Sequence, residues 1–176
     1  MNQHIAHTLQ LRDVSGYALL DFRSRDAVLA MIKKVRAAAI PIFFDPTTTG
    51  AMKIVPLAEV LTWVSLMDGI LLNAEEALYL GNARSIEEAE ENLKKYTPLV
   101  VIKLGSRGAM AVYNDHSARV AAVTTNVVDT TGAGDSFASG FIPMWLETRD
   151  LEKALSAGTA LAAKCVATVG ARPPLN

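Results

Sequence analysis

The chain has 176 residues, a length that suits one ordinary domain with a sizeable core. Hydrophobic residues make up 51% and charged residues 20%, which argues against a disordered chain, and the net charge of -1 shows no global bias toward nucleic acid or anionic membrane. The single cysteine excludes an internal disulfide or a cysteine-cluster metal site. No apolar run approaches the roughly 18 residues of a membrane helix and no secretory signal is visible, so we expect a globular, cytoplasmic protein.

Short apolar runs alternate with helical patterns along the whole chain. In its first half, the predicted elements are a strand over 14–20, a helix capped by Ser24 or Asp26, a strand over 40–44, a helical region over 51–66 and a strand over 69–72. In its second half, they are helices over 74–80 and from Ser85 to about Tyr96, strands over 99–103, 109–113 and 118–123, and two closing helices over 132–146 and 151–169. Gly81-Asn82 predicts a left-handed helix stop, and Asn114-Asp115 predicts the turn between two strands.

The runs IPIFF and LVVIK are apolar throughout, without the alternation of a half-exposed strand. Such strands belong to a sheet that is covered on both faces, and their alternation with helices predicts parallel βαβ units. Ligands bind beyond the carboxyl ends of the strands in such sheets. Functional residues are therefore expected just after strands, where Asp45, Asn73, Gly105 and Asp129 lie.

The most informative stretch is VDTTGAGDSF, residues 128–137. Small residues at 132–134 let the backbone turn tightly, and amides at a helix N-terminus form an anion site. Asp135 at such a site is suited to take a proton from a hydroxyl that attacks a bound phosphate. The alternative is an ordinary helix start with Asp135 in the first turn, which favours the helix dipole.

This stretch resembles the C-terminal signature of the ribokinase-like, or PfkB, carbohydrate kinases. Supporting segments lie in the family's order at 16–17 (GY), 43–46 (FFDP), 73–76 (NAEE), 103–108 (KLGSRG) and 170–173 (GARP). The resemblance implies an α/β fold, a three-layer α/β/α sandwich with a mostly parallel sheet. It also implies an ATP-dependent kinase acting on a hydroxyl of a sugar or nucleoside. Asp135 would be the general base, and the amides of Gly132, Ala133 and Gly134 would form the anion hole.

Two further segments acquire a nucleotide role from the resemblance. In KLGSRG, the residues expected to line the ATP site are Lys103, Gly105, Ser106, Arg107 and Gly108, although a tight turn between strands explains the glycines equally well. Lys103 stands where the family has a small polar residue, and two roles are open for it: it reaches a phosphate, or it points to solvent. Asn73 and Glu76 match a motif that organises Mg²⁺, its waters and ATP phosphates, and they also fit a capping box.

A monovalent cation such as K⁺ is a further expectation from the resemblance. Asp129 and Thr131 match cation-binding positions, with carbonyls expected from Cys165, Thr168 and Gly170, but Pro174 stands where a relative has a serine ligand. The alternative is that Asp129 braces the glycine loop. A role for Asp45 in the phosphate or metal network is open.

The resemblance covers only the C-terminal part of the family's usual length. Residues 1–176 are therefore interpreted as a single partial kinase domain that lacks the family's N-terminal strands and lid. Three explanations are open: a fragment, a natural truncation that pairs with a copy of itself or with the missing half to cover its sheet edge, and a non-catalytic module that binds nucleotide. The expected partner is a small-molecule sugar or nucleoside, with neither nucleic acid nor membrane.

Overall fold

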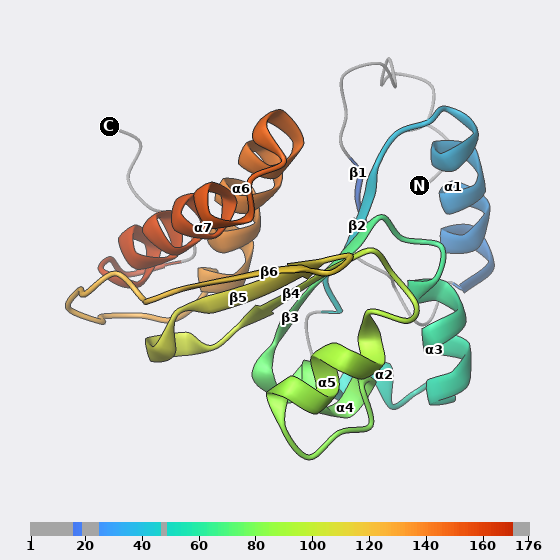
Figure 1. The fold of residues 1–176 in the computed structure, drawn as a ribbon, viewed down its shortest axis with the longest axis horizontal. Coiled ribbons are helices and arrows are strands. Elements are labelled where there is room, and N and C mark those ends of the chain that lie inside the picture. Colours follow the sequence, from blue (N-terminus) through green and yellow to red (C-terminus); the bar gives the residue numbers. More distant parts are fainter. Residues whose placement is uncertain (1–15, 19–24, 47–48, 171–176) are drawn as a thin grey trace.

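A single six-stranded sheet organises the chain, for which a computed structural model describes residues 16–18, 25–46 and 49–170 (Figure 1). The strands are β1 (Gly16–Ala18), β2 (Ile42–Phe44), β3 (Gly69–Asn73), β4 (Leu99–Lys103), β5 (Ala109–Tyr113) and β6 (His116–Val120). Their order in the sheet is β1-β2-β3-β4-β5-β6. Strands β1 to β4 run parallel, and β5 and β6 are antiparallel additions.

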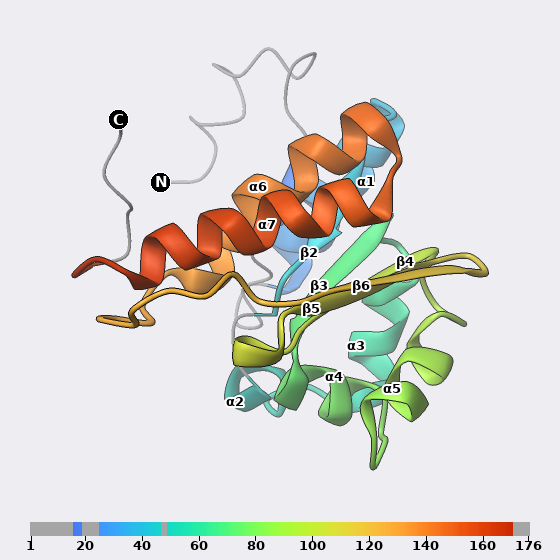
Figure 2. The ribbon, with the colours of Figure 1, turned by 60° about the vertical axis from the view of Figure 1, so that its left-hand side comes forward.

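Helices cover both faces of this sheet. They are α1 (Arg25–Ala37), α2 (Thr49–Met52), α3 (Leu57–Val64), α4 (Ala74–Leu80), α5 (Ile86–Leu93), α6 (Ala133–Thr148) and α7 (Leu151–Val166). Figure 2 shows α6 and α7 on one side of the sheet and α3, α4 and α5 on the other. The predicted three-layer α/β/α sandwich with a mostly parallel sheet is thus confirmed.

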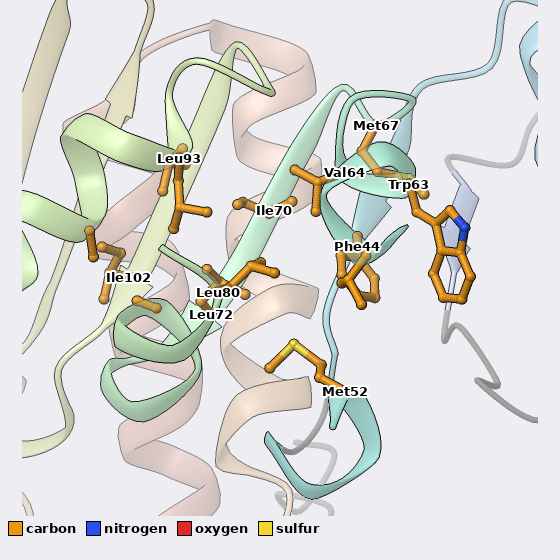
Figure 3. Close-up of a cluster of buried hydrophobic side chains, with 14 of the residues drawn as sticks. Phe44, Met52, Trp63, Val64, Met67, Ile70, Leu72, Leu80, Leu93 and Ile102 are labelled. Atoms are coloured by element: carbon orange, nitrogen blue, oxygen red, sulfur yellow. The ribbon is translucent and has the colours of Figure 1, made fainter. Parts of the chain in front are cut away.

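Alternate strand residues enter two separate cores, as the period of two requires. Phe44, Ile70 and Ile102 pack toward α3, α4 and α5, in the cluster that Figure 3 shows. Phe43, Leu71 and Val101, each one residue away, pack toward α6 and α7. The strands are therefore apolar on both faces because both faces are buried, and a residue's parity tells which helices it meets.

Several element boundaries differ from the sequence prediction. The helical region predicted over 51–66 contains two helices, α2 and α3. They are separated before Pro56, because proline lacks an N–H and disfavours a helical conformation of the preceding residue. Strand β6 is His116–Val120, earlier than the predicted 118–123. The left-handed residue after α4 is Asn82, with φ 46°, whereas Gly81 keeps φ -76°. Predictions for Ser24 and for residues 14–15 and 19–20 fall outside the described residues.

Within the described ranges, no helix combines the length and the apolar character needed to cross a membrane.

Candidate functional site

The carboxyl ends of three adjacent parallel strands place polar residues side by side. Asp45 directly follows β2, Asn73 ends β3, and Lys103 ends β4 in register with Asn73. Each residue lies two positions after Phe43, Leu71 or Val101, the strand residues that face α6 and α7. The same parity directs Lys103 and its neighbour Asp45 toward the α6 side of the sheet, whereas the Asn73 side chain turns to the start of α4.

An ion pair joins the ends of β2 and β4. The ammonium Nζ of Lys103 donates to Oδ2 of Asp45 at 2.6 Å, and the two side chains are 15% and 5% exposed. Strands two places apart in a sheet are separated by roughly 10 Å, a span that the long lysine side chain bridges above the end of β3. The lysine is thus directed across the sheet edge, away from solvent.

The start of α4 forms a complete capping box. The side chain Oδ1 of Asn73 accepts from the Glu76 amide at 2.9 Å, and the Glu76 carboxylate accepts from the Asn73 amide at 2.7 Å. Glu76 is only 1% exposed. Its burial raises the pKa of this carboxyl above the ordinary range, while the hydrogen bond from Asn73 and the charge of Lys103 oppose that rise. The capping interpretation of these residues is therefore confirmed.

Glycine supplies the turn that opens α6. Gly132 is the N-cap residue with φ 77°, a left-handed conformation that a side chain would strain. The Ala133 amide donates to the Thr130 carbonyl at 3.2 Å. The first helical hydrogen bond of α6 is donated by the Ser136 amide to the Gly132 carbonyl at 2.9 Å. Asp135 is exposed in the first turn. The predicted helix start and tight turn are confirmed.

The glycine turn meets the sheet edge at Lys103. A Cβ placed on Gly134 would lie 3.4 Å from the Lys103 ammonium. The structure thus brings together the first turn of α6, the Lys103–Asp45 pair and, through its electrostatic effect on Glu76, the start of α4. The sequence does not predict that Lys103 pairs with Asp45 or that Lys103 approaches Gly134. One signal for both contacts is present, since Asp45 and Lys103 each lie two positions after a strand residue that faces α6 and α7.

Asp129 braces the loop before α6 against the end of α7. Its carboxylate accepts from the amides of Thr131 at 2.9 Å and Gly170 at 3.0 Å, and these hydrogen bonds lower the pKa of the Asp129 carboxyl. The thiol of Cys165 donates to the Thr131 carbonyl at 3.4 Å. Asp129 does not directly follow a strand, because the irregular segment 121–128 separates it from β6. The loop brings Asp129, Thr131, Cys165 and Gly170 together, whereas Pro174 lies outside the described residues.

The segment after β4 is a tight turn that contains a short 3₁₀-helix, Gly105–Arg107. Gly108 has φ 90°, and a Cβ there would overlap the Val120 carbonyl of β6. The Leu104 amide donates to the Gly108 carbonyl at 2.8 Å, while Ser106 and Arg107 are exposed. Backbone conformation and close packing therefore explain the glycines of this turn. The exposed donors Ser106 and Arg107 lie at the same end of β4 as Lys103.

Among the described residues, no group of three or more His, Cys, Asp and Glu side chains is arranged to hold a metal ion. Mg²⁺ in phosphate-transfer sites needs few protein ligands, since it keeps several waters and binds phosphate oxygens. The capping box occupies one acceptor position each on Asn73 and Glu76, and a carboxylate has several. Glu76, with Asn73, therefore fits a magnesium ion bound partly through water.

Comparison with known proteins defines the class. The family described as pfkB family carbohydrate kinase matches residues 2–176, and the chain belongs to this family. A sugar kinase of Archaeoglobus fulgidus, described as uncharacterized, is 37% identical over 118 residues, which cover 62% of this chain and 46% of that protein. The 5-dehydro-2-deoxygluconokinase of Halalkalibacterium halodurans is 31% identical over 171 residues, covering 92% and 51%.

Solved structures give the same relationship. The crystal structure of adenosine kinase from Sinorhizobium meliloti has a TM-score of 0.80 and 27% identity, over 86% of this chain and 47% of that one. The ribokinase-like architecture predicted from the sequence is confirmed. The chain spans about half the length of these relatives.

Proposed function

We propose that this chain carries the nucleotide-binding and catalytic residues of an ATP-dependent kinase that phosphorylates a hydroxyl group of a sugar or nucleoside. The observation that supports this proposal is the approach of the glycine turn at Gly132–Gly134 to the sheet edge that carries Lys103, Asn73 and Glu76. Asp135 follows that turn directly, in the first turn of α6. A base, an anion site and a metal-binding carboxylate are the parts that phosphoryl transfer needs.

The reaction proceeds by attack of the acceptor hydroxyl oxygen on the γ-phosphorus of ATP. The bond from that phosphorus to the bridging oxygen breaks, ADP leaves with the electron pair, and the hydroxyl proton passes to the Asp135 carboxylate. The amides of Gly132 and Gly134 stabilise charge on the moving phosphoryl group, whereas the Ala133 amide, expected to share this role, donates to the Thr130 carbonyl. When bound at Glu76 and Asn73, Mg²⁺ would neutralise phosphate charge. The turn from Gly105 to Gly108, with Ser106 and Arg107, borders the nucleotide.

Asp135→Asn tests the role of the base. The variant should lose at least about 100-fold in phosphoryl transfer, because it cannot accept the proton, and it should retain Mg-ATP binding. The assay measures ADP release with a panel that includes fructose, adenosine and 5-dehydro-2-deoxygluconate, since relatives are named as kinases of these compounds.

Asp150→Asn is the matched control, because Asp150 also lies at a helix start, where its side chain accepts from the Lys153 amide. Asparagine caps a helix as well as aspartate does. Near-normal turnover by Asp135→Asn, equal to that of Asp150→Asn, would show that Asp135 is not the base.

The second candidate is a nucleotide-binding or assembly module without catalysis. This candidate predicts that the wild-type chain binds Mg-ATP and transfers phosphate to no member of the panel. A K⁺ requirement is a finer proposal, supported by the assembly of Asp129, Thr131 and Gly170, and replacement of K⁺ by Li⁺ in the same assays tests it.

A further inference from the structure

We propose that Lys103 contacts the γ-phosphate of ATP, the phosphoryl group that the proposed reaction transfers, and that Asp45 positions it. This inference rests on the proposed function and adds a side-chain cation to a phosphate site made otherwise of main-chain amides and a metal ion. Its basis is the place of the Lys103 ammonium, 2.6 Å from Asp45 Oδ2 and beside Gly134.

The burial of the pair argues against a purely stabilising role. Removing two charges from water costs about as much as their attraction returns, so a buried ion pair is weak support for a fold. The side chains of Lys103 and Asp45 are 15% and 5% exposed, and replacing such a buried pair by apolar residues of similar volume is often neutral or stabilising. We therefore expect the pair to serve function and not only stability, by positioning the Lys103 ammonium group next to the start of α6.

The geometry leaves donors for a phosphate. An ammonium group has three N–H donors, and the hydrogen bond to Asp45 Oδ2 uses one of them. An anion on the amides of the first turn of α6 would lie next to the remaining donors, because Gly134 belongs to that turn. Asp45 acts only through Lys103, since it fixes the end of a long and otherwise mobile side chain.

Charge at the sheet edge points the same way. Glu76 and Asp45 are both acidic and both buried, so an incoming phosphate meets two carboxyl groups at this edge. The Lys103 charge acts on Glu76 as well as on Asp45. A γ-phosphate can approach the amides of α6 more favourably when this ammonium is present, in addition to any metal ion at Glu76.

Calorimetric titration of the full chain with Mg-ATP and with Mg-ADP tests the inference. The wild-type chain should bind Mg-ATP at least about 10-fold more tightly than Mg-ADP, the ratio that a hydrogen bond to a charged group provides, and Lys103→Met should lose this preference. The ratio of the two dissociation constants is insensitive to partial unfolding, because both ligands meet the same folded fraction. Asp45→Asn should reduce the ratio, and Lys103→Arg should retain most of it, since guanidinium can bind both carboxylate and phosphate.

Lys94→Met is the matched control. Lys94 pairs with Glu91 at the same 2.6 Å, but on the exposed surface of the molecule at the end of α5. This variant should keep the wild-type ratio. An ATP preference that survives in Lys103→Met, or equal binding of ATP and ADP by the wild-type chain, would overturn the role of Lys103 while leaving the proposed function intact. A wild-type chain that binds neither nucleotide would overturn both.

A second measurement needs no methionine variant to fold. Lysine-selective ¹⁵N labelling gives side-chain ammonium signals, and the Lys103 signal is the one that disappears in Lys103→Arg. We expect this signal to shift when Mg-ATP is added and to stay in place with Mg-ADP. A signal that responds equally to both nucleotides, or to neither, would refute a γ-phosphate contact.

Discussion

Removing the charge of Lys103 should destabilise the fold strongly, and the structure gives the size of the effect. In Lys103→Met the buried Asp45 carboxylate loses its ion-pair partner. Breaking a buried pair from one side costs about 3–5 kcal/mol, and we expect about 3 kcal/mol because 15% of the Lys103 side chain is exposed. For a chain of this length the midpoint of thermal unfolding should fall by roughly 6–12 °C.

Tryptophan fluorescence during urea unfolding is a suitable assay. Trp63 in α3 and Trp145 in α6 are both buried, and they belong to the cores on opposite faces of the sheet. A shared transition would therefore report on the whole sandwich. In a double-mutant cycle with Asp45→Asn, the coupling free energy should be about 0.5–3 kcal/mol.

The surface pair between Lys94 and Glu91 provides the comparison. It has the same 2.6 Å distance, but its side chains are 32% and 62% exposed. Lys94→Met should cost much less stability than Lys103→Met, because water screens the pair. Equal losses in Lys94→Met and Lys103→Met would refute the reasoning, since burial is the only difference on which the larger value depends.

Two further predictions concern the start of α4. Asn73→Ala and Ser85→Ala each remove a helix N-cap and should each cost about 1 kcal/mol in urea unfolding, but only Asn73→Ala should weaken Mg-ATP binding in calorimetry. Equal nucleotide affinities would contradict the metal role of Asn73. Glu76→Gln should become more stable relative to wild type as the pH rises above 4.5, the ordinary pKa of a glutamate. Burial raises the pKa of Glu76 in the native state, so the wild-type chain loses stability as the pH rises from the unfolded-state pKa to the native pKa. Glutamine does not titrate, so the variant has no such loss. Parallel pH profiles of the unfolding free energy in the two chains would refute this prediction.

Local signals in the sequence predict many of the elements. Strand 99–103 and helix 74–80 are found with the predicted bounds, and Asn73 and Ser85 accept the predicted capping hydrogen bonds. These predictions depend on residues within a few positions of one another, so one segment suffices to make them. The helical region over 51–66 is predicted more coarsely, because it contains two helices that are separated before Pro56.

The candidate site is predicted less completely because it depends on distances between segments. The sequence indicates that Asp45 and Asn73 follow strands, but the pairing of Asp45 with Lys103 requires the order β2-β3-β4 and a side chain long enough to cross β3. Gly134 meets Lys103 only because α6 lies on the face that residues 43, 71 and 101 share. The contact between Asp45 and Lys103, which are 58 positions apart, depends on the order of the strands as well as on the parity of these residues.

The same topology suits the proposed function, in which a nearly neutral chain would hold several phosphate charges. The turn at Gly132 presents backbone amides, which carry no net charge, and the carboxyl end of β4 adds a single ammonium group at Lys103. Asp45 balances that ammonium before a ligand arrives, so the buried pair adds no net charge to the folded protein. A metal ion at Glu76 would arrive together with the nucleotide and would not be bound permanently. Under the proposed function, positive charge would reach the site together with the phosphate, and a basic surface patch would not be required.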